Sequence, residues 1–153
     1  MQAQKIVTLA RSWIGTPYHN MTAVKGRGCD CLGLLRGVHA EAYGDMVEAP
    51  SYRSRPPRKT SGQETMLEAA RHYLVEAPVE TRGPAVVLVF RTHPKLVAWH
   101  CGIMTTETEM VHSHSGREVY EVTLGERWEP KVVAALSFLI LRTKAWLLLP
   151  LDL

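Results

Sequence analysis

The sequence contains no apolar run long enough to cross a bilayer, and its beginning lacks the pattern of a secretion signal. A membrane-spanning helix needs about 20 apolar residues, whereas the longest apolar runs are Ala85–Phe90 and Ala145–Leu151. Lys5 and Arg11 interrupt the first turns of the chain, and no apolar stretch there precedes a small-residue cleavage site. We therefore expect a protein that is synthesised in the cytoplasm without a signal peptide and has no membrane partner.

Cysteine is scarce, and the three cysteines of the chain are an odd number, which argues against a disulfide framework. Cys29 and Cys31 form a Cys-x-Cys pair, but no second pair stands at the spacing of a zinc finger. A metal site that joins this pair to histidines is therefore the weakest reading. The remaining readings are packing as small buried residues and chemistry.

Charge of one sign is also limited, because the net charge is +3 and the Lys and Arg residues are scattered. This pattern gives no reason to expect a nucleic acid partner, although it allows a weak attraction to polyanionic surfaces. The chain has 153 residues, of which 46% are apolar and 22% charged. Those values are typical of one soluble globular domain.

Hydrophobic periodicity predicts helices first and strands afterwards. Apolar residues recur at helical spacing over residues 2–14, 30–43 and 61–77, and an exposed loop rich in Pro, Ser and Arg, Ala49–Ser61, lies between the second and third helices. Ser61 and Glu64 have the spacing of a capping box. Short segments of strand length follow: Ala85–Phe90, His100–Met104, Met110–Ser113, Val119–Thr123 and Val132–Leu141. The order predicts an α+β fold with an antiparallel sheet.

One stretch, Gly28–Leu34, joins a glycine-rich loop to the start of the second predicted helix. A cysteine at a helix N-terminus faces unpaired backbone N–H groups and the positive end of the helix dipole. Both favour the thiolate, which is the nucleophilic form of cysteine. Cys31 is therefore a candidate nucleophile, beside the alternative that it is a small packing residue.

A thiolate enzyme needs a base, and two of the seven histidines lie in strand-like segments. His100 begins one segment and His112 lies within another, and strand alternation places His112 and His114 on one face. Either histidine alone fits an ordinary surface position. Together with Cys31, they supply a nucleophile, a base and a third polar group that orients the base.

Four elements in this order resemble the NlpC-type cell-wall peptidases, a papain-like family. They are Trp13–Tyr18 (WIGTPY), Gly28–Leu34 (GCDCLGL), His100–Ile103 (HCGI) and Met110–His112 (MVH). The resemblance implies a papain-like α+β fold in which N-terminal helices pack on an antiparallel sheet, with residues 1–144 as a single domain.

The resemblance also implies roles for individual residues. Cys31 would be the nucleophile, His100 the base and His112 the group that orients the base, while Tyr18 and Asp30 would lie near the substrate. The implied substrate is a peptidoglycan stem peptide, cut between D-glutamate and the diamino acid, whose free amino end could pair with Asp30. No metal and no organic cofactor are implied.

The doubled cysteine of GCDCLGL, with HCGI later, is similar to a branch of the family found in tailed phages and gene transfer agents. That similarity implies a place at the tail tip of a virion or phage-like particle, with hub proteins of the tail as partners. Residues 145–153 are apolar and would serve as a docking peptide or pack on the domain's own sheet. A catalytically silent tail protein, or an amidase or transferase on the same scaffold, remains an alternative.

Overall fold

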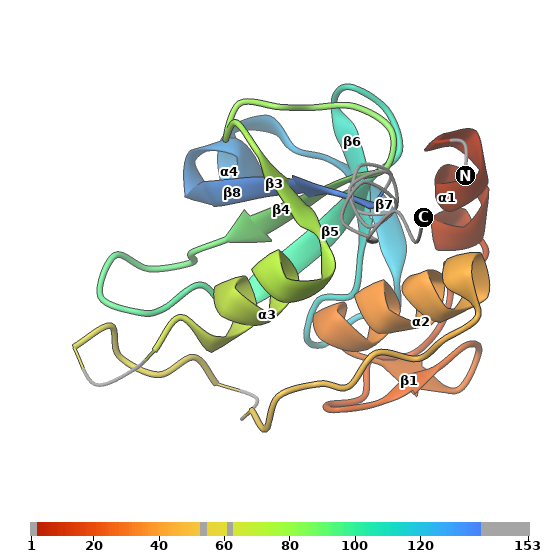
Figure 1. Cartoon of the computed structure of the whole chain (residues 1–153), viewed down its shortest axis with the longest axis horizontal. Coiled ribbons are helices and arrows are strands. Elements are labelled where there is room, and N and C mark those ends of the chain that lie inside the picture. The colour runs from red at the N-terminus through yellow and green to blue at the C-terminus, as the bar shows by residue number, and fades with distance from the viewer. Residues whose placement is uncertain (1–2, 53–54, 61–62, 139–153) are drawn as a thin grey trace, which may run out of the picture.

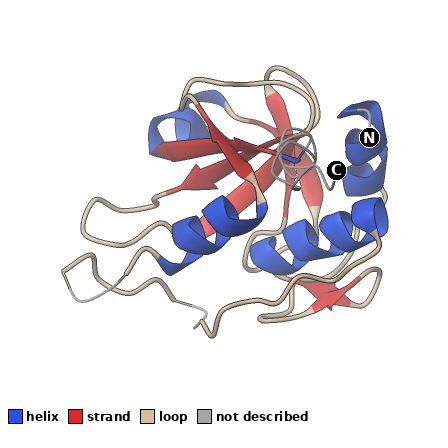
Figure 2. Cartoon of the chain, in the orientation of Figure 1, coloured by secondary structure: helices blue, strands red, loops and turns tan. Residues whose placement is uncertain are grey.

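The computed structural model describes residues 3–52, 55–60 and 63–138, which form an antiparallel sheet with helices packed against it (Figures 1 and 2). In chain order the elements are α1 (Ala3–Arg11), β1 (Ala23–Val24), β2 (Gly28–Cys29), α2 (Cys31–Tyr43), α3 (Thr65–Tyr73), β3 (Val75–Ala77), β4 (Val86–Phe90), β5 (His100–Met104), β6 (Glu109–His112), β7 (Tyr120–Thr123), α4 (Gly125–Trp128), the 3-10 helix η1 (Glu129–Lys131) and β8 (Val132–Ser137). The larger sheet has six strands in the order β3-β8-β4-β5-β6-β7, with antiparallel neighbours throughout. The predicted α+β fold is confirmed.

Helix α2 begins and ends where the sequence predicts. Asp30 is the N-cap and accepts a hydrogen bond from the backbone N–H of Gly33 at 2.7 Å. Gly44 ends the helix with φ of +90°, a left-handed conformation that glycine adopts without strain. A Cβ at Gly33 would lie 1.9 Å from the carbonyl oxygen of Thr22, so glycine is needed where the preceding loop crosses the first turn.

The predicted third helix is too long at both ends. Helix α3 begins at Thr65, and Glu64 makes no side-chain cap; the Ser61 of the predicted capping box lies outside the described residues. The helix stops at Tyr73, well before Pro78, and the chain continues as β3. Pairing of β3 with β8 satisfies its backbone groups as a strand, and this long-range contact outweighs the local helical pattern.

The first helix is shorter than predicted. Helix α1 ends at Arg11, and residues 12–15 form a turn that closes at Gly15, with φ of +92°. Strand β8 is described as far as Ser137. Residues 139–141 of its predicted range and the apolar segment 145–153 lie outside the described residues. No helix in the described ranges is long and apolar enough to cross a membrane.

The two faces of the six-stranded sheet are covered differently. On one face, called the helix face here, alternate residues such as Val87, Val89 and Ile103 pack with the buried sides of α1, α2 and α3 in one large apolar cluster. On the other, the Trp128 face, residues such as Leu88 and Met104 pack in a smaller cluster that includes Trp128 of α4. Figure 1 shows α2 and α3 below the strands of the sheet and α4 at the upper left.

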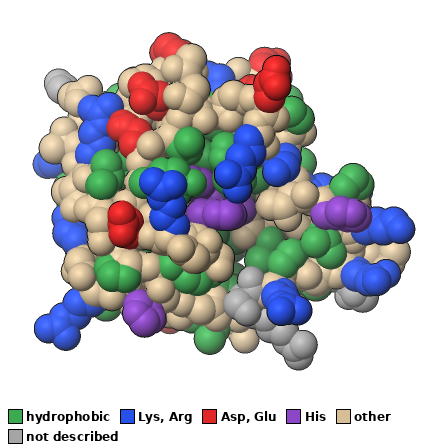
Figure 3. All heavy atoms as spheres, turned by 180° about the vertical axis from the view of Figure 1, so that it is seen from behind, with side chains coloured by type: hydrophobic (Ala, Val, Ile, Leu, Met, Phe, Trp, Pro, Cys, Tyr) green, Lys and Arg blue, Asp and Glu red, His purple; other side chains and the backbone are tan. Residues whose placement is uncertain are grey.

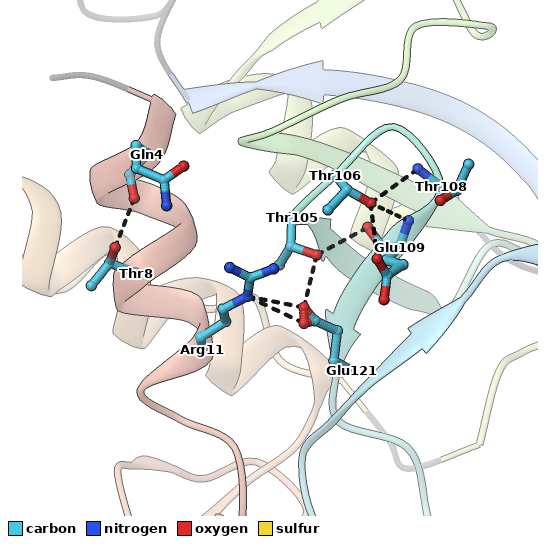
Figure 4. A network of polar contacts seen from close by, with 8 residues as sticks. All are labelled: Gln4, Thr8, Arg11, Thr105, Thr106, Thr108, Glu109 and Glu121. Atoms are coloured by element: carbon cyan, nitrogen blue, oxygen red, sulfur yellow. Dashed lines mark hydrogen bonds and ion pairs between the residues drawn. The ribbon is translucent and has the colours of Figure 1, made fainter.

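A polar network ties α1 to the end of the sheet (Figure 4). The Arg11 guanidinium donates to both carboxylate oxygens of Glu121 in β7, at 2.9 and 3.2 Å. Thr105, just after β5, donates to the same carboxylate at 3.1 Å. In the turn from β5 to β6, the hydroxyl of Thr106 accepts from the backbone N–H of Glu109 at 3.0 Å. The Arg11–Glu121–Thr105 contacts link α1 to β7 and to the end of β5.

Candidate active site

Cys31 is the first residue of α2, and it is the least buried of the three cysteines. Its sulfur lies 3.8 Å from the carbonyl oxygen of Trp99, the residue before β5. Cys29 and Cys101 are buried in the helix-face cluster. Cys31 therefore combines partial exposure with a place at a helix N-terminus, as a nucleophile requires.

The other two thiols are held in the protonated form. Burial raises the pKa of Cys29 to about 11, helped by the nearby charge of Asp30. The pKa of Cys101 lies well above its ordinary value, because its thiol lies against Cys31 and is buried. The thiol of Cys101 also points at the backbone carbonyl of Cys31, 3.4 Å away. Neither residue matches the environment of a reactive cysteine.

His100 and His112 meet across neighbouring strands. The Nε2 atom of His100 in β5 lies 2.8 Å from the Nδ1 atom of His112 in β6, which is a hydrogen bond. Because Nε2 of His100 is engaged, its Nδ1 atom remains for another partner. A Cβ at Gly102 would lie 3.3 Å from the Cβ of His112 and 2.6 Å from the sulfur of Met110. Glycine at this position therefore leaves room for the pair.

Cys31 and His100 line the same cavity, of about 150 Å³, although they come from opposite faces of the sheet. His100 pairs with Phe90 of the Trp128 face, whereas α2 packs on the helix face. The two faces meet at the end of the sheet where β5 begins. The remaining lining residues are Tyr18, Asn20, Asp30, Tyr52, Pro56, Met66, Thr92, Trp99, Ser113, His114 and Ser115.

Burial keeps the histidines neutral. The pKa of His100 lies well below its ordinary value, first because the ring is buried and then because His112, His114 and Lys131 repel a proton there. Burial lowers the pKa of His112 to about 3, with His114 and two arginines adding to the effect. A neutral His100 at neutral pH can accept a proton, which is the state that a general base needs.

Asp30 is buried and its carboxylate makes three hydrogen bonds within the protein. Besides capping α2, it accepts from the backbone N–H of Met21 at 2.7 Å and from the hydroxyl of Tyr52 at 2.5 Å. Met21, which donates this backbone hydrogen bond to Asp30, has a left-handed conformation with φ of +56°. The role of Asp30 in holding a substrate amine stays a prediction, but Asp30 also builds the wall of the cavity.

Tyr18 lines the cavity as the sequence predicts. Burial raises the pKa of its hydroxyl, and the nearby Cys31 and Asp30 add to the shift. Its backbone forms a bridge with Cys29, which places it beside the start of α2. Its contact with substrate stays a prediction.

Sequence reasoning missed three aromatic residues at or beside this site, Tyr52, Trp99 and Trp128. Tyr52 comes from the Pro- and Arg-rich loop after α2, and its ring lies edge-on to Trp99, with centroids 6.3 Å apart. Trp128 lies under the histidines, 5.1 Å from His100 and 5.1 Å from His112 between ring centroids. The loop sequence around Tyr52 carries no periodicity, so no local signal could have found it. No group of three or more potential ligands within the described ranges is arranged to hold a metal ion.

Solved structures of NlpC/P60 domains have the same fold. The NlpC/p60 domain of the peptidoglycan hydrolase SagA superposes with a TM-score of 0.63 at 18% identity, covering 90% of this chain and 99% of that one. An NLP/P60 family protein from Staphylococcus aureus, similar to a lipoprotein, gives 0.62 at 19% identity, covering 89% and 41%. An NlpC/P60 family protein from Bacillus cereus gives 0.62 at 18% identity, covering 91% and 41%.

This chain therefore has the papain-like NlpC/P60 fold, and it spans about two fifths of the length of the S. aureus and B. cereus proteins. Identities below a fifth establish the fold and leave activity to be argued from the site. Neither a family model nor a curated protein matches the sequence.

Proposed function

We propose that this protein is a cysteine peptidase that hydrolyses the peptide stems of bacterial peptidoglycan. The observation that carries the proposal is a cysteine at a helix N-terminus sharing one cavity with a neutral histidine that is hydrogen-bonded to a second histidine. This is the constellation of nucleophile, base and orienting group. The SagA domain, which has the same fold, belongs to a peptidoglycan hydrolase.

The proposed reaction passes through an acyl-enzyme. His100 takes the proton of Cys31 at Nδ1, because Nε2 is occupied by His112. The sulfur attacks the peptide carbonyl carbon, and the backbone N–H of Cys31 helps to stabilise the negative oxygen. His100 then gives its proton to the leaving amine as the C–N bond breaks. Water, deprotonated by His100, attacks the thioester, which releases the acid and restores the thiol.

The proposed substrate is a stem peptide cut between D-glutamate and the diamino acid. Tyr18 and Asp30 lie on the α2 side of the cavity and would contact the acyl half. Asp30 accepts three internal hydrogen bonds but forms no ion pair within the described chain. Its negative charge can therefore still attract the amino group of a substrate by electrostatic attraction. This would favour stems with a free amino end.

Digestion of purified peptidoglycan tests the proposal. The wild-type chain should release soluble stem fragments that mass spectrometry identifies by the new amino end on the diamino acid. Cys31→Ala should release none above background, whereas the matched control Cys29→Ala should retain activity, because Cys29 is a buried thiol outside the cavity lining. Fragments cut between sugar and peptide would indicate an amidase, and ligated products a transferase. No fragments from the folded wild-type chain would favour a silent structural protein.

We also propose that the enzyme acts at the tail tip of a virion or phage-like particle, with tail hub proteins as partners. This rests on the sequence resemblance carried by Gly28–Leu34 and His100–Ile103. Deleting residues 145–153 should abolish incorporation into particles while the free protein still digests peptidoglycan. Unfolding of the truncated protein, followed by circular dichroism, would instead assign that segment to the domain's own core.

A further inference from the structure

Three basic side chains gather on the Trp128 face beside the histidines. The Arg127 guanidinium and the Lys131 ammonium each lie 5.3 Å from the centroid of the Trp128 ring. The Arg117 guanidinium lies 3.9 Å from the centroid of the Tyr120 ring. Aromatic faces hold cations in place by cation–π attraction without neutralising their charge. We call Arg117, Arg127 and Lys131 the basic cluster.

Within the described part of the chain, no carboxylate forms an ion pair with the basic cluster. Five Lys and Arg side chains form ion pairs with glutamates: Arg11–Glu121, Lys25–Glu41, Arg71–Glu76, Arg82–Glu129 and Arg91–Glu64. None of the cluster's three side chains forms one with any described carboxylate. Glu118 and Glu126, which adjoin Arg117 and Arg127 in sequence, form no ion pair with any described residue either. The positive charge of the cluster is therefore left for another anion.

The cluster adjoins the cavity through His114. That side chain lines the cavity with Cys31 and lies 5.4 Å from Trp128 between ring centroids. The backbone N–H of Arg117 donates to the carbonyl of His114 at 3.2 Å. Repulsion from Arg127 and Lys131 adds to burial in lowering the pKa of His114. Figure 3 shows Lys and Arg side chains on both sides of a histidine near the middle of this face of the molecule.

Groups of opposite charge therefore lie at the cavity and near it. Asp30 lines the cavity with Tyr18 and Cys31, whereas the basic cluster lies outside the lining and adjoins it through Trp128 and His114. A peptide held across it would be favoured with its amino end toward Asp30 and a carboxylate toward the cluster. Because His100 delivers the proton to the leaving amine, the half of the peptide beyond His100 is the leaving half.

We propose that Arg117, Arg127 and Lys131 form a carboxylate-binding subsite for the leaving half of the peptide substrate. This subsite depends on the proposed peptidase function. The group that it would select is a free carboxylate on the C-terminal side of the cut bond. Arginine and lysine bind carboxylates through charge-assisted hydrogen bonds. The subsite would make the enzyme prefer short stems with a free carboxyl end over stems whose end is blocked.

Two synthetic stem peptides that differ only in their terminal group test the subsite. One ends in a free carboxylate and the other in the corresponding amide, and both contain D-glutamate followed by the diamino acid. We expect the wild-type KM to be about fivefold to tenfold lower for the acid, with little change in kcat. The double variant Arg127→Gln/Lys131→Gln should lose this difference, while Lys5→Gln/Lys95→Gln, which removes two exposed cations elsewhere, should keep it.

Binding to the Cys31→Ala variant separates the subsite from catalysis. Isothermal titration calorimetry with both peptides should show the same preference for the acid, and Arg127→Gln/Lys131→Gln in that background should remove it. Tighter binding of the acid supports the subsite even if the wild-type enzyme cleaves neither peptide, an outcome that would sink the peptidase proposal alone. Equal binding of acid and amide overturns the subsite even if both are cleaved. If the variant bound the acid and the amide more weakly by the same factor, the cluster would provide only a general attraction to the peptide, and the carboxylate subsite would also be overturned.

Discussion

The two faces of the sheet are built from the same strands but perform different tasks. The helix face buries apolar side chains from three helices and has Cys31 at its border. The Trp128 face has a smaller apolar cluster and buries two hydrogen-bonded histidines. Apolar burial stabilises a fold, whereas buried polar groups cost free energy unless they are paired. The helix face therefore supplies most of the stability, and the Trp128 face retains polar groups that chemistry requires.

The incomplete pairing on the Trp128 face supports this contrast. The Nε2 atom of His112 and the Nε1 atom of Trp128 are buried without a hydrogen-bond partner among the described residues. A buried unpartnered donor costs about 1–3 kcal/mol. By comparison, the buried Asp30 carboxylate at the border of the helix face accepts three hydrogen bonds. Substitutions that alter residues of one face and leave the other unchanged test whether the two faces have these different roles.

The largest effect is expected at His100. His100→Gln removes the proposed base on the Trp128 face and should lower kcat/KM about a thousandfold, with thermal unfolding changed little. The matched control is His93→Gln, which alters an exposed histidine in the loop between β4 and β5. Kinetics with a stem peptide and calorimetry of both variants check this. Retained activity in His100→Gln would remove His100 from the mechanism.

A substitution on the helix face should lower stability and leave activity nearly unchanged. Ile6 of α1 is fully buried in the helix-face cluster. Ile6→Ala should lower the free energy of unfolding by about 2–5 kcal/mol, because it leaves a cavity. Urea denaturation measures this loss, and kcat/KM per folded molecule should stay within about twofold of wild type. A large loss of kcat in the folded variant would show that the two faces are coupled.

Low pH should lower the stability of the fold because of His112 on the Trp128 face. The pKa of His112 is about 3 in the folded protein and near 6.5 in an unfolded chain. The unfolded state therefore takes up a proton that the folded state refuses, so this contribution to stability is complete above pH 6.5 and is lost as the pH falls toward 3.

We expect the melting temperature to fall by about 5 °C or more between pH 7 and pH 4.5. The His112→Gln variant should fall less steeply, because it lacks this proton uptake, whereas His72→Gln, which alters an exposed histidine, should follow wild type. Differential scanning calorimetry across this pH range measures the slopes. Identical slopes for all three proteins would mean that His112 is not held neutral by the fold.

The smallest effect is expected at Tyr52, on the wall that the helix face contributes. Tyr52→Phe removes the hydroxyl that donates to Asp30 and leaves the ring against Trp99. We expect a loss of about 1–2 kcal/mol in unfolding free energy and a rise in KM for stems with a free amino end. Tyr43→Phe removes a tyrosine hydroxyl that donates to the carbonyl of Phe138, away from the cavity, and serves as control. An unchanged KM in Tyr52→Phe would restrict Tyr52 to a structural role.

The sequence alone determined those features that depend on near neighbours in the chain. Asp30 caps the helix that follows it, and Gly44 ends that helix, so the position of Cys31 at a helix N-terminus could be predicted. Strand alternation likewise placed His112 and His114 together, and their rings lie 5.8 Å apart between centroids. Capping and alternation act within a few residues, so a local pattern is enough to predict them.

The tertiary structure alone decided which distant side chains share the cavity. Strand alternation says that His100 and Cys101 point to opposite faces, but it does not say that Cys31 and His100 meet where those faces join. Tyr52 reaches Asp30 from an aperiodic loop, and residues after Tyr73 became strand because β8 pairs with them. These contacts depend on the packing of segments far apart in sequence, whose free energy outweighs local preference.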